Sequence, residues 1–273
     1  MFFASDLDRT LIYSKLFLEQ AECSYELVET YEGKNISYMS TQAINLLKQL
    51  HRLMPIVPIT TRNEMQYKRI SAFQEMICPE LYVVNNGGTI IYKGREDEVW
   101  SKHIKDEIEA LSVGYEEALS AFLDTYQKPV KSYHKSDELI WLIIGERNNI
   151  DELAVALFKK TFEPKGWEIK VNGKKIYLYP RCINKCSAMQ YIEKNFYNGP
   201  IIAAGDSILD YQMVHEADYG LVPKAAYIEG ECQKHIWITE HSGLRAAEDI
   251  LKYAIDQAEQ ILYKGLSIEM SKN

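Results

Sequence analysis

The sequence has no apolar run long enough to span a bilayer, so we expect no membrane partner. Its first residues lack a basic region followed by an apolar stretch and a cleavage site, which favours a cytoplasmic location without a secretory signal. Positive charge is also scarce, because 31 lysines and arginines stand against 39 acidic residues. Nucleic-acid-binding proteins normally present a basic face, so we expect no nucleic-acid partner. Any phosphate site must take its positive charge locally, from a metal ion, a lysine or backbone amides.

Cysteine and histidine are too few and too scattered to define a metal or disulfide framework. An odd number of cysteines predicts reduced, mostly buried thiols; the five are Cys23, Cys78, Cys182, Cys186 and Cys232. Cys182 and Cys186 have C-x3-C spacing, but without a second such pair this is weak evidence for a zinc site. The six histidines show no ligand spacing.

Two acids close to the N-terminus follow an apolar stretch that is typical of a buried parallel strand. Asp6 and Asp8 are two positions apart, so extended geometry directs both side chains to one face. Two like charges this close are unfavourable unless a cation or a shared proton lies between them. The motif therefore indicates a metal site, although Asp and Thr are also ordinary turn and cap residues at the end of a strand.

The length of 273 residues allows one large domain or two smaller ones. Strand and helix patterns alternate in residues 1–90 and 181–273, which predicts an α/β core with a doubly wound parallel sheet. Residues 14–39 are hard to interpret, apart from a hairpin that turns at Gly33. The core strands are expected at 2–7, 56–59, 81–84, 200–204 and 219–222. Its main helices are expected at 41–53, from the turn at 60–63 through about residue 73, at 185–196 and at 244–263.

The pattern changes in residues 91–180, which we expect to form an inserted α+β domain of order αββαββ. A helix is predicted over 101–126 and another over 150–162, each followed by two strands. The second strand pair is a hairpin, because Asn172-Gly173 is a typical two-residue loop. Strands are expected near 129–134, 138–144, 167–171 and 174–179.

Chemically reactive side chains follow three of the predicted core strands, and a lysine begins a helix. Alone, each piece has an ordinary structural interpretation as a cap or a surface residue. Ligands of open parallel sheets bind beyond the carboxyl ends of the strands, so these pieces are expected to converge. They are Asp6-Leu7-Asp8-Arg9-Thr10, Thr60-Thr61-Arg62, Lys185, and Gly205-Asp206-Ser207-Ile208-Leu209-Asp210.

In order and in strand context, these pieces resemble the four motifs of the haloacid dehalogenase superfamily of phosphotransferases. The resemblance covers the full chain. It is closest to the branch with the Cof-type sugar phosphatases and sucrose-phosphate phosphatase, which carries a cap between the second and third motifs. It implies a Rossmann-like core with a C2-type cap. Two positions depart from the common pattern: Arg9 and Thr61 stand where glycine is frequent.

The resemblance also implies roles for single residues. Asp6 would be the nucleophile and Asp8 the general acid and base, with its proton affinity raised by Asp6. Phosphate would be held by Thr60 or Thr61 and by Lys185. Arg62 would face the substrate or form a surface salt bridge. The Mg²⁺ site would consist of Asp6, the backbone carbonyl of Asp8, Asp206 and Asp210, where Asp210 binds directly, binds through water, or orients Lys185.

The function expected from the sequence is that of a magnesium-dependent phosphomonoester hydrolase acting on a small phosphorylated metabolite, most simply a sugar phosphate. The alternatives are a phosphomutase or phosphotransferase of the same superfamily, and a binding module that keeps the fold without turnover. Arg147, His134 and Lys135 are candidate cap contacts to substrate, or solvated surface residues. Oligomeric state is left open.

Overall fold

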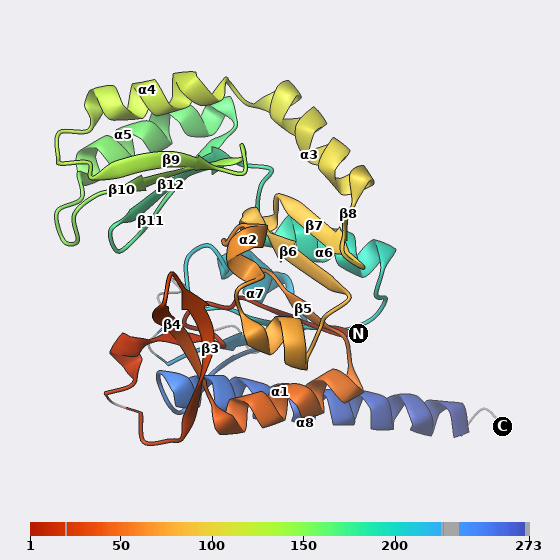
Figure 1. Ribbon diagram of the computed structural model, residues 1–273. Helices are drawn as coiled ribbons and strands as arrows, with labels where there is room; N and C mark the ends of the chain where they lie inside the picture. Colours follow the sequence, from red (N-terminus) through yellow and green to blue (C-terminus); the bar gives the residue numbers. More distant parts are fainter. Residues whose placement is uncertain (20, 225, 227–234, 271–273) are drawn as a thin grey trace.

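The computed structural model describes residues 1–19, 21–224, 226 and 235–270, and Figure 1 shows its arrangement. Its centre is a parallel sheet of five strands in the order β15-β14-β13-β1-β5. All residues of β1, β5 and β13 are buried, as expected for strands covered on both faces. The strands are β1 (Phe2–Ser5), β5 (Ile56–Pro58), β13 (Ile201–Ala204), β14 (Tyr219–Val222) and β15 (Ile236–Ile238).

Helices cover both faces of this sheet, which confirms the predicted α/β fold class. On one face, α1 (Thr41–Leu53) packs beside α8 (Leu244–Met270), and both run below the sheet in Figure 1. On the other face lie α6 (Lys185–Asn195) and α7 (Tyr211–Glu216). The predicted start of α1 is confirmed, since the Ser40 hydroxyl accepts a hydrogen bond from the Ala43 amide at 2.9 Å.

One strand that was expected in the parallel sheet belongs mainly to a separate antiparallel sheet. β6 (Leu81–Val84) forms an antiparallel sheet with β7 (Thr89–Tyr92) and β8 (Arg95–Glu96). A single parallel bridge, between Ile59 and Val83, links β6 to the chain beyond β5. The reason is the turn η3 (Asn85–Gly87), which returns the chain directly into β7. The helix predicted through residue 73 is also shorter, because α2 (Glu64–Tyr67) ends before a separate π turn, η2 (Ala72–Met76).

The middle of the chain forms a four-stranded antiparallel sheet in the order β11-β12-β10-β9. Helices α4 (Tyr115–Thr125) and α5 (Glu152–Phe162) cover its outer face (Figure 1). Phe122, Phe158 and Trp141 form part of a separate hydrophobic core there. The sheet and its helices match the inserted cap that the sequence predicted. The strands are β9 (Ser132–Ser136), β10 (Ile140–Ile144), β11 (Trp167–Asn172) and β12 (Lys175–Pro180), with the short turn η4 (Glu163–Lys165) before β11.

The helix predicted over 101–126 is wrong as a single element. It is divided into α3 (Glu98–Leu111) and α4, with an extended segment between them. That segment is held by the cap core: the Val113 amide donates to the Lys165 carbonyl, and the Val113 carbonyl accepts from the Trp167 indole at 2.9 Å. These long-range contacts replace the helical hydrogen bonds that the local pattern predicts.

A third antiparallel sheet precedes α1 and lies beside the core (Figure 1). It consists of β2 (Tyr13–Ser14), β4 (Lys34–Ser40) and β3 (Tyr25–Tyr31), with a short turn η1 (Lys15–Phe17) after β2. The hairpin turns at Glu32-Gly33, both with positive φ, as predicted. The register of β3 is irregular on both sides of Glu29.

No helix in the described part of the chain is long and apolar enough to cross a membrane. Cys23, Cys78, Cys182 and Cys186 are free thiols, and Cys232 lies outside the described residues.

Candidate active site

Asp6 occupies the first position beyond the carboxyl end of β1. Its amide donates to the Ala204 carbonyl at 2.9 Å, which continues the pairing of β1 with β13. The loop that follows is tight, because the Leu7 carbonyl accepts from the amides of Thr10, Leu11 and Ile12. The Thr10 hydroxyl also donates to Asp6 at 3.4 Å. Asp6 is therefore held in a buried, well-defined position, with 5% of its surface exposed.

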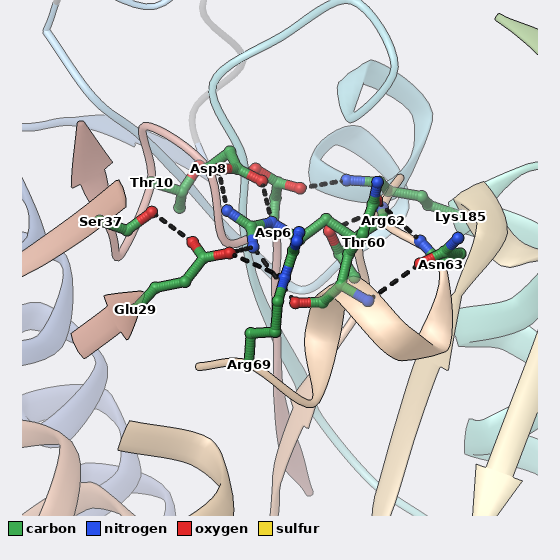
Figure 2. A network of polar contacts seen from close by, with 11 residues as sticks. Asp6, Asp8, Thr10, Glu29, Ser37, Thr60, Arg62, Asn63, Arg69 and Lys185 are labelled. Carbon is green, nitrogen blue, oxygen red and sulfur yellow. Dashed lines mark hydrogen bonds and ion pairs between the residues drawn. The ribbon is translucent and has the colours of Figure 1, made fainter. Parts of the chain in front are cut away.

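Lys185 is the first residue of α6, and it is 1% exposed. Its ammonium donates to Oδ1 of Asp6 at 2.5 Å and to Oδ1 of Asp210 at 2.6 Å. Burial alone would lower the pKa of Lys185, but the two carboxylates raise it above its ordinary value, so the lysine is charged. Figure 2 shows the lysine pointing toward Asp6.

The position of Lys185 depends on Gly87 in the η3 turn. Gly87 has a φ of +102°, and a Cβ there would lie 2.2 Å from the Asn184 carbonyl oxygen. Only glycine lets the η3 turn lie directly against the start of α6. The same turn contacts the second motif, since the Asn86 amide donates to the Thr60 carbonyl at 2.9 Å.

Three buried acids, Asp6, Asp206 and Asp210, form one cluster whose nearest ligand atoms all lie within 4.8 Å of one another. Burial is the largest cause that raises the pKa of Asp6 and of Asp206, and the neighbouring carboxylates raise it further. The nearby cations are Lys185 and the half-exposed Arg9, whose Nε lies 3.6 Å from Asp206. A cluster with this excess of buried oxygen donors fits a divalent cation such as Mg²⁺.

Asp210 uses both carboxylate oxygens within the protein. One accepts from Lys185, and the other accepts from the amide and hydroxyl of Ser207 at 3.0 and 2.7 Å. Gly205 permits this arrangement, because a Cβ there would lie 2.3 Å from the Asp210 Cβ. These contacts favour orientation of Lys185 among the roles considered for Asp210.

Thr60 and Thr61 follow β5 beside Asp6. Thr60 is fully buried; its amide donates to the Val83 carbonyl at 3.0 Å, and its hydroxyl oxygen accepts from the Arg62 amide at 3.2 Å. The hydroxyl proton of Thr60 remains available for donation to a phosphate oxygen. Thr61 is half-buried.

Arg62 forms a two-point ion pair with Asp8, at 2.6 Å from Nε and 2.7 Å from Nη2 (Figure 2). The Arg62 side chain is only 11% exposed and the Asp8 side chain is half-exposed, so this is a partly buried contact and not the surface salt bridge considered from sequence. Burial would raise the pKa of Asp8, but the hydrogen bonds and charge of Arg62 lower it below its usual value. The expectation that Asp6 raises the proton affinity of Asp8 is therefore wrong: the arginine outweighs the neighbouring acid.

The side chains of the cap sheet alternate between the helices and the core. Paired residues His134, Leu142, Tyr177 and Lys170 form one row across the four strands. Tyr177 in this row packs with core residues, and the charges of Asp8, Lys185 and Asp6 act on its pKa. Burial raises that pKa most. His134 therefore lies on the face directed to the core.

Lys135 lies on the opposite face of the cap sheet from His134. Its ammonium is 2.8 Å from Glu138 and stacks over Tyr115 and Trp141, so Lys135 serves the cap itself. Arg147 is exposed in the turn after β10. The sequence interpretation missed Lys175 on β12, an exposed cation whose charge lowers the pKa of Asp8. Lys175 lies on the same face of β12 as Tyr177, two residues along the strand, and that orientation is known only from the structure.

The family described as sucrose-6F-phosphate phosphohydrolase matches residues 1–243. No curated protein sequence matches the chain significantly. Among solved structures, the sucrose-phosphatase from Synechocystis sp. PCC6803, determined with sucrose and phosphate, has a TM-score of 0.66 at 15% identity, covering 95% of this chain and 98% of that one.

Two further structures share the fold. The subclass IIB sugar phosphatase BT4131 of the haloacid dehalogenase superfamily has a TM-score of 0.59 at 13% identity, over 97% of this chain and 98% of that one. The haloacid dehalogenase-like hydrolase yhjK from Bacillus subtilis has a TM-score of 0.54 at 14% identity, over 92% and 90%. At these identities the structures establish the fold, and the family match extends over most of the sequence. The chain thus belongs to the sucrose-6F-phosphate phosphohydrolase family.

Proposed function

We propose that this phosphatase is a magnesium-dependent hydrolase of a small sugar phosphate and that it works through an aspartyl-phosphate on Asp6. The observation that carries the proposal is the buried carboxylate of Asp6, which contacts the Lys185 ammonium and forms one cluster with the acids Asp206 and Asp210. A nucleophile, a fixed cation and a set of oxygen ligands therefore meet at one strand end. Phosphoryl transfer needs these three parts and little other covalent chemistry.

In the first step, an Asp6 oxygen would attack phosphorus and the bond from phosphorus to the ester oxygen would break. Asp8 would donate a proton to the departing oxygen. Water would then attack the aspartyl-phosphate, with Asp8 accepting its proton, and inorganic phosphate would leave. The Arg62 pair keeps Asp8 ionised, which suits the second step. A bound phosphate dianion would raise the proton affinity of Asp8 for the first step by charge repulsion.

Asp6, Asp206 and the backbone carbonyl of Asp8 would hold Mg²⁺, with Asp210 as a direct, water-mediated or lysine-orienting partner. When bound, Mg²⁺ supplies charge stabilisation to the phosphate oxygens. Lys185 would bind a second phosphate oxygen with its ammonium, and Thr60 would donate its hydroxyl proton to a third. Thr61 would add its amide or its hydroxyl.

The cap sheet supports a sugar as the leaving group. Its core-directed row combines the hydrogen-bonding groups of His134, Tyr177 and Lys170 with the apolar side chain of Leu142. Sugars present hydroxyls at their edges and apolar C–H faces, which such a surface matches. The family match points to the same substrate class. Arg62 would reach the substrate only by exchanging its pair with Asp8.

The test is a panel of phosphomonoesters with Mg²⁺, comprising sucrose phosphate, hexose phosphates and non-sugar phosphates, with release of inorganic phosphate as the readout. We expect preference for a sugar phosphate, and loss of activity by at least about a thousandfold in Asp6→Asn. Asp256→Asn, an exposed acid on α8, is the matched control. Isomerised hexose phosphate in place of free phosphate would indicate a mutase. No turnover of any ester by the folded protein would refute the proposal in favour of a binding module.

A further inference from the structure

A fourth buried acid lies outside all the motifs described above. Glu29 is on β3 and is 2% exposed, although its strand neighbours Leu27 and Tyr31 are 39% and 48% exposed. In a regular strand, residues two apart share a face, so Glu29 would be expected at the surface with them. The register irregularities on both sides of Glu29 break the alternation, and Val28 and Glu29 are buried in succession. Bulges of this kind redirect a side chain, and they are frequent beside active sites.

The redirected carboxylate of Glu29 accepts hydrogen bonds from two side chains and lies near a second guanidinium group. Oε1 accepts from Nη1 of Arg62 at 2.8 Å and lies 3.4 Å from Nε of Arg69. Oε2 accepts from the Ser37 hydroxyl at 2.6 Å. The backbone is fixed as well, because Glu29 forms a bridge with Ile70. Figure 2 shows Glu29 and Asp8 on two sides of the same guanidinium group.

This places Arg62 between two acids with different surroundings. Glu29 has no exposed side-chain surface, whereas the Asp8 side chain is 47% exposed. A guanidinium is planar, so a partner fixed at one nitrogen limits the plane in which its other nitrogens donate. Glu29 is the fixed partner. Asp8 lies in a loop at the solvent-accessible side, and its carboxylate takes its orientation from Arg62.

We propose that Glu29 is a positioning residue: it holds Arg62 so that the guanidinium fixes the direction of the Asp8 carboxylate. The proposal rests on the proposed function, in which Asp8 transfers protons to and from the reacting oxygens. A general acid acts only within hydrogen-bond reach of its target. A half-exposed aspartate without a fixed partner would rotate among several directions. The sheet formed by β2, β4 and β3 therefore contributes to catalysis through Glu29, without touching substrate.

The experiment compares Glu29→Gln with Glu26→Gln, an exposed acid on the same strand. Each variant is assayed with an alkyl phosphomonoester, such as a sugar phosphate, and with p-nitrophenyl phosphate. The alkyl oxygen needs a proton from Asp8 as it leaves, whereas p-nitrophenolate leaves without one. In Glu29→Gln we expect kcat/KM to fall at least about tenfold for the alkyl ester and less than about twofold for p-nitrophenyl phosphate, because kcat/KM covers the steps up to departure of the alcohol and excludes the later hydrolysis, in which Asp8 acts with either ester. All values for Glu26→Gln should stay near wild type.

A uniform loss with both esters, or no loss, would overturn the proposal, because an effect on folding or on phosphate binding does not depend on the leaving group. If Glu29→Gln folds poorly, Ser37→Ala removes one partner of the Glu29 carboxylate and should give the same selective loss at smaller size. Side-chain NMR gives a readout independent of turnover. The Arg62 Nε–H signal, assigned by its loss in Arg62→Lys, should be protected from exchange in wild type and in Glu26→Gln but not in Glu29→Gln. An unchanged signal would overturn the positioning role, whereas absent turnover in wild type would refute only the proposed function.

Discussion

The ammonium of Lys185 lies 2.5 Å from a carboxylate oxygen of Asp6, although the two residues are 179 positions apart in the chain. Both are buried, and Asp210 completes the contact on the other side of the lysine. A buried lysine between two acids offsets their repulsion and remains charged, so Lys185 contributes to the stability of the metal-free protein as well as to the phosphate binding proposed for it.

Replacing Lys185 with Met should destabilise the metal-free protein by about 3–5 kcal/mol, because it leaves buried carboxylates without their cation. Urea denaturation measures the loss. Mg²⁺ should restore part of it, since a divalent cation also compensates the acids. Lys194→Met, at an exposed position near the end of the same helix, is the control and should change stability by less than about 0.5 kcal/mol. Equal effects of the two substitutions would contradict this account.

The metal-free protein should lose stability as pH rises from about 5 to 8. Burial raises the pKa of Asp6 and Asp206 in the folded state, so the folded protein binds more protons than the unfolded chain in this window. Unfolding free energies at several pH values test the slope. Asp206→Asn removes one of the two groups and should flatten it, and saturating Mg²⁺ should flatten it in wild type. A slope that is identical in wild type and Asp206→Asn would exclude this origin.

Gly205→Ala should destabilise the protein by about 1–3 kcal/mol and reduce activity strongly, because the new Cβ overlaps Asp210, which orients Lys185. Thermal unfolding and phosphate release measure the two effects. At Gly114 a Cβ meets no heavy atom within 4 Å, so Gly114→Ala is the matched control and should change little. Normal activity in a folded Gly205→Ala protein would show that the position of Asp210 is not critical.

Lys175→Met should raise KM for a sugar phosphate about tenfold with a small change in kcat, because Lys175 lies on the core-directed face of the cap and its charge acts on Asp8. Lys135→Met should leave KM unchanged, since Lys135 lies on the helix side with Glu138. Steady-state kinetics of the two variants therefore report which face of the sheet meets the substrate. A larger rise in KM for Lys135→Met would reverse the assignment.

The sequence predicted the cluster of Asp6, Lys185, Asp206 and Asp210 because parallel strands end at one edge of a sheet, and strand ends can be located from local patterns. It did not predict Glu29, because the burial of that side chain depends on a bulge whose cause is pairing with β4. The break between α3 and α4 depends likewise on Trp167, more than fifty positions away. Long-range contacts of this kind leave no periodicity in the local sequence.

The backbone conformation at Arg9 could be predicted only in part from the sequence. Glycine is frequent there in related motifs, and Arg9 has a φ of 67°, in the region that favours glycine. The sequence shows that Arg9 replaces the frequent glycine, but it does not show why. The side chain that replaces glycine lies near Asp206, so a strained backbone position carries a cation at the edge of the acid cluster.

The pairing of β1 with β5 on one side and β13 on the other has a consequence for how the chain acquires its structure. During synthesis, β1 can pair early with β5, but its second neighbour emerges only after the cap has been made. Closing so large a loop is slow, and the cap, which has its own hydrophobic core, has time to form first. The edge of β1 that pairs with β13 therefore has no partner strand until residue 201 is available, and unpaired strand edges favour aggregation during that interval.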